Sequence, residues 1–452
     1  LVDKKLSEER METDLSRRDL LKNGVAMAAG GVAAAGGAIL AAPAEAQVSA
    51  SPTPPRPYRA WIRHGTTGGV QTVQPRAISG RQVMVRVEYC QADYSQVGIV
   101  LGSANRALPQ IPGDSSIGRV EAIGADVRSL QVGDRVIIAV KSQCGRCHQC
   151  LRGRSDRCAT TEGVRGVEIA DLADGTPVTQ QSSGGGKGGL AEVAIVYEDA
   201  CVPVFSEVPS DQLAMLCCTG TTGLALAMTA RPIDAGADVV VFGAGPVGLS
   251  AVQGARIQGA NQIIVVEPIA ARRQLALKLG ATAAVDPNVD TATLLERLRE
   301  MCKGPTDRIF AGGKGGGANR GPDFVIEAVG ADYAPPKAEA GPDPTGILPL
   351  QQVWDLCPGG GHIVTSGVGY PQGAMLSLSP GQFTNGAKTI QGGQYGAAQS
   401  LRDVRRNIKL IEKGLFDAQS MISAVYPLDK VRDAHQAVVD RTVISALVSC
   451  QT

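Results

Sequence analysis

The clearest alternation of apolar and polar segments lies in the second half of the chain. The apolar run Ala237–Phe242 predicts a buried strand, Leu249–Gln258 has helical periodicity, and Gln262–Val266 predicts a second buried strand. Further strand-like runs with glycine turns follow within 278–286, 322–330 and 359–368. Strands that are buried on both faces and alternate with helices are typical of a parallel sheet. We therefore expect an α/β fold that contains a doubly wound sheet.

The turn between the first strand and its helix is rich in glycine and reads Gly243-Ala-Gly245-Pro246-Val247-Gly248. Such glycines let backbone N–H groups approach a pyrophosphate at the N-terminus of the helix. Glu267 ends the second strand, where a carboxylate can accept hydrogen bonds from ribose hydroxyls and repel a 2′-phosphate. The pattern favours NAD, while Arg272 and Arg273 keep NADP open. The alternative is a doubly wound domain that binds no nucleotide.

Four cysteines, Cys144, Cys147, Cys150 and Cys158, lie within fifteen residues. Short C-x2-C steps let one loop surround a zinc ion with four sulfur ligands, and such a closed site is structural. His148 is superfluous to a complete four-sulfur set. The competing interpretation is two disulfides, which an exported protein could form.

The N-terminal segment resembles a twin-arginine export signal. Arg17-Arg18 precede a weakly apolar run from Gly24 to Ala42, and Ala44-Glu-Ala46 follows as a small-x-small cleavage site. We expect a mature periplasmic protein that begins near Gln47 and has no stable membrane insertion after cleavage. The alternative is a membrane-anchoring helix, and Met11 is a candidate for the true start.

The composition limits the classes of partner that we expect the protein to bind. The chain has 452 residues, 44% of them hydrophobic and 19% charged, and its net charge is +1. This length suffices for two substantial cores. The near-zero charge provides no basic field for nucleic acid or for an anionic membrane.

With the four cysteines upstream of the glycine-rich turn, the chain resembles the zinc-containing alcohol dehydrogenases of the medium-chain dehydrogenase superfamily. The segments Val132–Ile138, Gly189–Val193 and Cys218–Gly223 belong to the resemblance. It implies a GroES-like, β-rich catalytic domain and a Rossmann domain, with Thr222 among the cofactor-binding residues. The expected parts are a signal peptide and extension at 1–46, the catalytic domain at 47–219, the Rossmann domain at 220–396, and a return to the catalytic domain at 397–452.

The resemblance also implies a catalytic zinc held by Cys90, Asp114 and Cys218, with Asp114 in place of a histidine and Ser115 after it. Three anionic ligands would make the zinc less electrophilic than a set with neutral imidazole. The proton-relay positions of the family fall on Ala92 and Ser95, so another route through Ser115, Ser116 or water would be needed. The alternative is that the three ligand residues are remnants in a zinc-free cleft.

Two glycine- and proline-rich segments, Lys303 to Pro322 and Ala331 to Leu348, interrupt the second half. The second matches in position a loop that covers NAD in glutathione-independent formaldehyde dehydrogenases and dismutases. Because no nicotinamide pool exists outside the cytoplasm, we expect a nicotinoprotein that keeps NAD(H) bound, oxidises an alcohol or aldehyde, and is reoxidised by a second substrate or an external electron acceptor. The alternatives are a zinc-free quinone or aldehyde reductase and a non-catalytic small-molecule-binding protein. The family resemblance also implies a homo-oligomer, either a dimer or a tetramer.

Overall fold

The computed structural model describes residues 56–102, 104–162, 166–180, 187–302, 321–332, 346–370 and 372–451. The predicted export signal, Met11 and most of both predicted insertions lie outside the described residues. Within the described part of the chain, no helix is long and apolar enough to cross a membrane.

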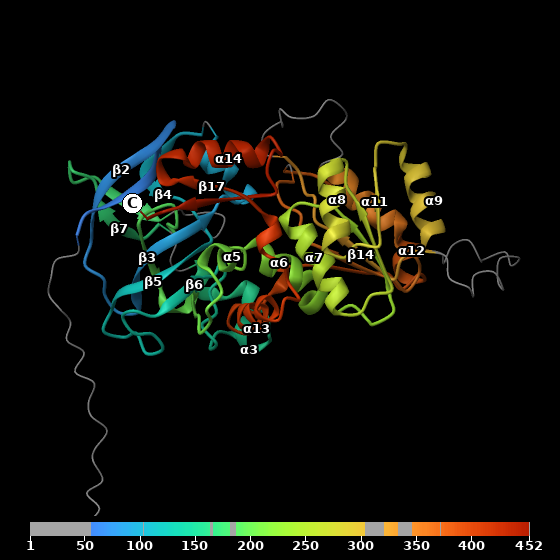
Figure 1. The fold of residues 1–452 in the computed structure, drawn as a ribbon, viewed down its shortest axis with the longest axis horizontal. Coiled ribbons are helices and arrows are strands. Elements are labelled where there is room, and N and C mark those ends of the chain that lie inside the picture. The colour runs from blue at the N-terminus through green and yellow to red at the C-terminus, as the bar shows by residue number, and fades with distance from the viewer. Residues whose placement is uncertain are drawn as a thin grey trace, which may run out of the picture. The chain divides into compact units, whose positions relative to one another are not determined.

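The second half folds as predicted into a parallel sheet, which we call the α/β lobe (Figure 1). Its described strands run in the order β13 (Ala283–Val285), β12 (Gln262–Val266), β11 (Asp238–Phe242), β14 (Phe324–Glu327), β15 (His362–Thr365) and β16 (Thr389–Gly392). The main helices of this lobe are α7 (Pro246–Ile257), α8 (Ala270–Leu279), α9 (Thr291–Met301), α11 (Ile347–Leu356) and α12 (Pro380–Thr384).

Alternate residues of the central strands are buried on opposite faces of this sheet. Val239 and Val241 of β11 pack with the core that contains α7 and α8, whereas Val240 and Phe242 pack with α9 and α11. Because both faces are covered, the strands read as continuous apolar runs, which is why their positions were predictable.

The first half forms a β-rich lobe. A closed barrel contains β1 (Tyr58–Gly65), β2 (Thr67–Pro75), β7 (Glu168–Asp171), β8 (Pro177–Gln180) and β4 (Arg106–Ile111). Beside it a described sheet runs β10 (Cys201–Pro203), β6 (Arg135–Ile138), β5 (Ser116–Ile123), β3 (Gln82–Gln91), β18 (Ser445–Ser449) and β17 (Ile422–Pro427), with β9 (Val193–Tyr197) also paired to β3. Short helices of this lobe are α2 (Val97–Val100), α3 (His148–Leu151) and α4 (Ala159–Glu162).

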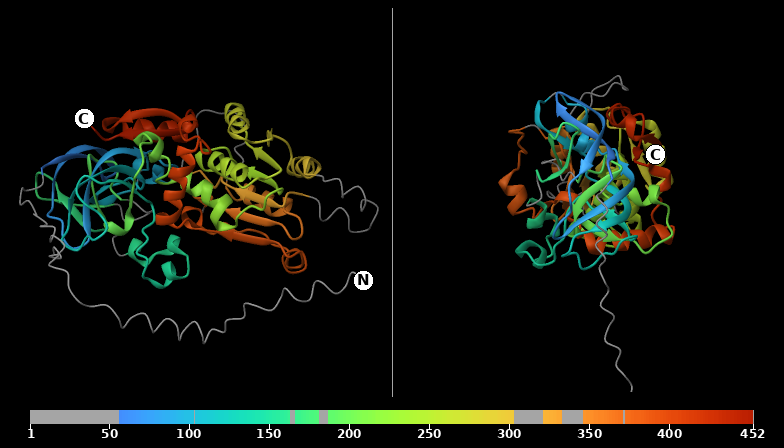
Figure 2. Two further views of the ribbon diagram at one scale, coloured as in Figure 1. Left: turned by 60° about the horizontal axis from the view of Figure 1, so that its bottom comes forward. Right: turned by 90° about the vertical axis from the view of Figure 1, so that its left-hand side faces the viewer.

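The C-terminal segment returns to the β-rich lobe. Strand β18 pairs antiparallel with β3, placing Val448 opposite Cys90, so the red C-terminal strands lie beside the blue ones (Figure 1, Figure 2). Four helices lie near the two places where the chain passes between the lobes. They are α5 (Ser210–Ala214), α6 (Thr219–Ala225), α13 (Ser400–Glu412) and α14 (Val431–Val439). The α/β lobe is therefore inserted between two pieces of the β-rich lobe, and the α/β class expected from the sequence is confirmed.

Candidate active site

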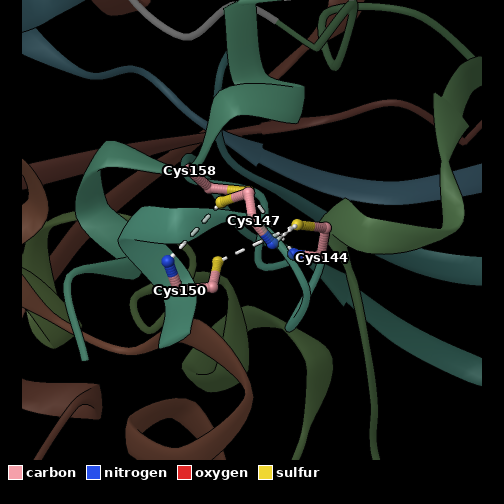
Figure 3. A group of neighbouring side chains, drawn as sticks. All are labelled: Cys144, Cys147, Cys150 and Cys158. Atoms are coloured by element: carbon pink, nitrogen blue, oxygen red, sulfur yellow. Dashed lines mark hydrogen bonds between the residues drawn. The ribbon is translucent and has the colours of Figure 1, made fainter. Parts of the chain in front are cut away.

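The four clustered cysteines converge on one point. The Sγ atoms of Cys144, Cys147, Cys150 and Cys158 all lie within 4.8 Å of one another (Figure 3). The Sγ atoms of Cys144 and Cys150 are 4.0 Å apart, about twice the length of a disulfide bond, and all four cysteines are free. Four sulfurs in this arrangement fit a tetrahedral zinc ion.

Backbone N–H groups donate hydrogen bonds to these sulfurs and so favour the binding of a cation. The N–H of Cys147 donates to Cys144 Sγ at 3.3 Å, and the N–H of Cys144 donates to Cys158 Sγ at 3.4 Å. N–H groups of Ala159 and Cys150 lower the pKa of Cys147 to about 6, whereas burial raises the pKa of Cys150. Thiolate is the form that binds metal, so the donors favour the ligand state of the loop.

A second group of candidate metal ligands consists of Asp93, Asp114 and Cys218, whose ligand atoms lie within 4.8 Å of one another. Asp93 is the N-cap of a 3-10 helix, η1 (Tyr94–Gln96), Asp114 lies in the turn before β5, and Cys218 directly precedes α6. The structure thus brings together two of the three predicted ligands, Asp114 and Cys218.

The predicted ligand Cys90 is not a member of this group, although burial and, after it, the charges of Asp114 and Asp93 contribute to raising the pKa of its thiol. Cys90 lies within β3, where it faces Val448 of β18 and Ser116 of β5, and it is fully buried in the apolar core. Its Sγ packs so closely on Gly189 that a Cβ there would lie 3.1 Å away. Asp93, three residues further on, stands in the group instead.

Asp93 was not predicted as a candidate metal ligand, because the nearby Cys90 matches the family pattern. The available signal was its place just before a helical segment, where Asp is a favoured N-cap. In the structure its side chain makes no capping hydrogen bond, so the carboxylate is directed to the ligand group instead.

Serine hydroxyls surround the two carboxylates. Ser95 Oγ donates to Asp114 Oδ2 at 2.9 Å, and Ser115 Oγ lies 3.1 Å from Asp114 Oδ1 and also contacts Asp93 Oδ2. Ser95, one of the two relay positions named from the resemblance, thus bonds a carboxylate of the metal group.

The ligand group fits a divalent cation. Asp93 Oδ1 is buried and has no hydrogen-bond partner. Burial, and then the charge of Asp114, raise the pKa of Asp93 well above its usual range, and burial followed by both carboxylates does the same for the Cys218 thiol. Buried groups of like charge are costly unless a cation compensates them. Two carboxylates and a thiolate are accepted zinc ligands and leave a coordination position for substrate.

Asp93 also lines a deep pocket between the two lobes. From the β-rich lobe come Gln91, Ala92, Asp93, Tyr94, Thr219, Arg441 and Ser445; from the α/β lobe come Gly243, Gly245, Pro246, Val247, Glu267, Arg272 and Asp332, with others. Predicted cofactor residues therefore share one cavity with Asp93, whereas the other two members of the metal group, Asp114 and Cys218, lie outside its lining. Gly248 and Thr222 do not line it: Gly248 packs the helix onto the turn, since a Cβ there would lie 1.9 Å from Gly243 O, and Thr222 Oγ1 donates to Cys218 O at 2.9 Å.

Glu267 is fixed at the wall of this pocket. The N–H of Ala244 donates to its Oε2 at 2.7 Å, and the N–H of Ile269 donates to Oε1 at 3.0 Å. Arg272 lines the pocket, whereas Arg273 bonds the carbonyls of Glu267 and Pro268 and pairs with Asp286 at 3.1 Å. Of the two arginines that kept NADP open, only Arg272 thus lines the pocket.

A second buried acid, Glu327, was not predicted; it bonds Val329 and Gly367, which line the pocket. Its Oε1 accepts the N–H groups of Val329 and Gly330 at 2.9 and 2.7 Å. Its Oε2 accepts from Thr365 Oγ1, Gly367 N and Tyr370 OH at 2.6, 3.1 and 3.0 Å. One carboxylate thereby ties together the two loops that follow β14 and β15, at the strand ends where α/β sheets bind ligands.

The histidines lie outside both ligand groups of the described residues. His64 is exposed, His362 Nδ1 contacts Thr389 Oγ1 at 2.7 Å, and the buried His435 Nδ1 contacts Val431 O at 2.8 Å. These contacts are structural.

Comparison with known families and proteins agrees with this geometry. Residues 79–206 match the alcohol dehydrogenase GroES-like domain, and residues 246–340 match the zinc-binding dehydrogenase domain. The chain is 26% identical to S-(hydroxymethyl)glutathione dehydrogenase of Saccharomyces cerevisiae, over 83% of this chain and 92% of that protein. It is 26% identical to the NDMA-dependent alcohol dehydrogenase of Amycolatopsis methanolica, over 81% and 92% of the two chains.

Two further proteins are similar over different extents. Geraniol dehydrogenase of Castellaniella defragrans is 35% identical, over 49% of this chain and 61% of that protein. The crystal structure of benzyl alcohol dehydrogenase from Acinetobacter calcoaceticus superposes with a TM-score of 0.73 at 24% identity, covering 88% of this chain and all of that one. The latter shows a shared fold.

Proposed function

Because the chain belongs to the zinc-containing alcohol dehydrogenases of the medium-chain dehydrogenase superfamily, we propose that it exchanges hydride between an alcohol or aldehyde and a tightly bound NAD(H), outside the cytoplasm. The observation that carries the proposal is that Asp93, a member of the metal group, lines the same pocket as Gly245 and Glu267. An alcohol bound in this pocket would share the cavity with Asp93 and with the predicted cofactor residues.

Each residue of the site has a role in this chemistry. Asp93, Asp114 and Cys218 would hold the zinc, which when bound polarises the alcohol oxygen and lowers its pKa while NAD⁺ takes the hydride. Ser95 and Ser115 hold protons against the two carboxylates and fix their orientation. Ser95 Oγ donates to Asp114 and does not line the pocket, so the alcohol proton would leave by another group or by water. The glycine turn binds the pyrophosphate at the N-terminus of α7.

The retained cofactor is supported by the location that the N-terminal sequence predicts. Arg17-Arg18 and the following segment resemble an export signal for folded proteins, and a dehydrogenase that released NADH outside the cytoplasm would stop. We propose that a second substrate or an external electron acceptor reoxidises the bound NADH. The relative from Amycolatopsis methanolica is named for dependence on NDMA, which accords with turnover that needs an added reactant.

Purification of the protein from the periplasm tests the proposal. Acid denaturation should release NAD(H) in near-equal amount to protein, and metal analysis should find close to two zinc ions per chain, one for each ligand group. Protein free of nucleotide would contradict a retained cofactor. One zinc per chain would instead favour a zinc-free reductase or a small-molecule-binding protein.

A further inference from the structure

One carboxylate joins the two lobes at the wall of the pocket. Tyr94 OH donates to Asp332 Oδ1 at 2.7 Å, and Arg441 NH2 donates to Asp332 Oδ2 at 2.7 Å. All three residues line the pocket, and the side chains of Arg441 and Asp332 are only 12% and 20% exposed. Hydrogen bonds between charged groups in such shielded positions are stronger than those on open surface.

The three side chains come from different parts of the fold. Asp332 follows β14 in the α/β lobe. Tyr94 directly follows the metal-group residue Asp93, and Arg441 lies in the turn between α14 and β18 of the β-rich lobe. Both contacts of Asp332 therefore cross from one lobe to the other.

Backbone hydrogen bonds fix the segments that carry Asp332 and Arg441. Glu327 accepts the N–H of Gly330, and the N–H of Ala331 donates to Val368 O at 2.7 Å, which fixes the approach to Asp332. Arg441 has a left-handed backbone, φ 58°, and its N–H donates to Val438 O at 3.2 Å. A non-glycine residue keeps this conformation only where its surroundings impose it.

We propose that Asp332 is a positioning residue that holds the β-rich lobe closed against the α/β lobe and so limits dissociation of the dinucleotide. The inference rests on the proposed function, since it concerns the cofactor of that site. Opening the pocket separates Asp332 from both Tyr94 and Arg441, so two charge-assisted contacts oppose cofactor release. Tyr94 also extends the connection to the metal group through its neighbour Asp93.

The test is the rate at which NADH leaves the purified holoenzyme, followed by cofactor fluorescence after dilution into excess NAD⁺. We expect Asp332→Asn and Tyr94→Phe each to raise the rate about tenfold, which corresponds to about 1.4 kcal/mol. The double variant should fall short of the product of the two, because both act through the same carboxylate.

Asp429→Asn is the matched control. It removes an arginine–aspartate pair of 2.6 Å with Arg59 that lies within the β-rich lobe, and it should leave the release rate within about twofold. Unchanged release from holoenzyme in both Asp332→Asn and Tyr94→Phe would overturn the inference. Wild-type protein that binds no NADH at all would instead contradict the proposed function.

Discussion

At the scale of single residues, the difference between Cys90 and Asp93 decides the chemistry of the ligand group. A thiolate at the first position would give the zinc two sulfurs and one oxygen, whereas Asp93 gives two oxygens and one sulfur. With a metal bound all three would be anionic, so the zinc would be a weaker Lewis acid than one with an imidazole ligand. Ser95 and Ser115 partly offset this by donating hydrogen bonds to the carboxylates.

Asp93→Ala should reduce the zinc content from about two to about one ion per chain, because the remaining pair, Asp114 and Cys218, is too few for a stable site. Atomic emission on purified protein measures this. Cys90→Ala is the control and should retain about two ions, since Cys90 packs in the core. Loss of zinc from the Cys90 variant with retention in the Asp93 variant would restore the prediction made from sequence.

At the scale of elements, the packing of α6 on α7 positions Cys218 relative to the glycine turn. Gly223 of α6 lies so close to α7 that a Cβ there would be 2.1 Å from Val247 O and 2.5 Å from Ser250 Cβ. The contact carries Cys218 at the start of α6 toward Pro246 and Val247 at the start of α7. Glycine is needed at this point for close approach of two helices.

Gly223→Ala should therefore lower the free energy of unfolding by about 1–3 kcal/mol or more, the cost of forcing atoms into a filled interface. Urea unfolding measures the change. Gly98→Ala in α2 is the control: nothing lies within 4 Å of its Cβ position, so the free energy of unfolding should stay within about 0.5 kcal/mol of wild type. Equal effects of the two substitutions would argue against close contact at Gly223.

At the scale of the whole molecule, the chain leaves the β-rich lobe at α6 and returns to it through β17 and β18. The pocket is complete only when both crossings are made, since Thr219 precedes the α/β lobe and Arg441 follows it. Binding of cofactor and stability of the fold are therefore linked.

Acid should destabilise the whole fold through His435 of α14. Burial lowers the pKa of this histidine from 6.5 to about 4. Between those values the unfolded chain binds a proton that the folded chain excludes, so stability falls as pH drops from 6.5 toward 4. Relative to His435→Met, wild type should lose about 2 kcal/mol between pH 7 and pH 5 in denaturant unfolding. Parallel curves for the two proteins would contradict a buried neutral histidine.

Features with local causes could be predicted from the sequence. The run Ala237–Phe242 is apolar because β11 is covered on both faces, and the glycine turn follows it directly. The four cysteines needed only a short loop to meet. Domain boundaries, the export signal and the oligomeric state stay predictions.

The sequence by itself determined the α/β class, the nucleotide turn and the four-cysteine site, because each depends on residues close together in the chain. Only the tertiary structure decided which acid completes the ligand group, where Glu327 gathers two loops, and that Asp332 meets Tyr94 and Arg441. Asp332 and Tyr94 are 238 residues apart, and no local pattern records such a contact. Likewise, only the structure shows that Asp93, rather than Cys90, stands with Asp114 and Cys218 in one group of candidate ligands.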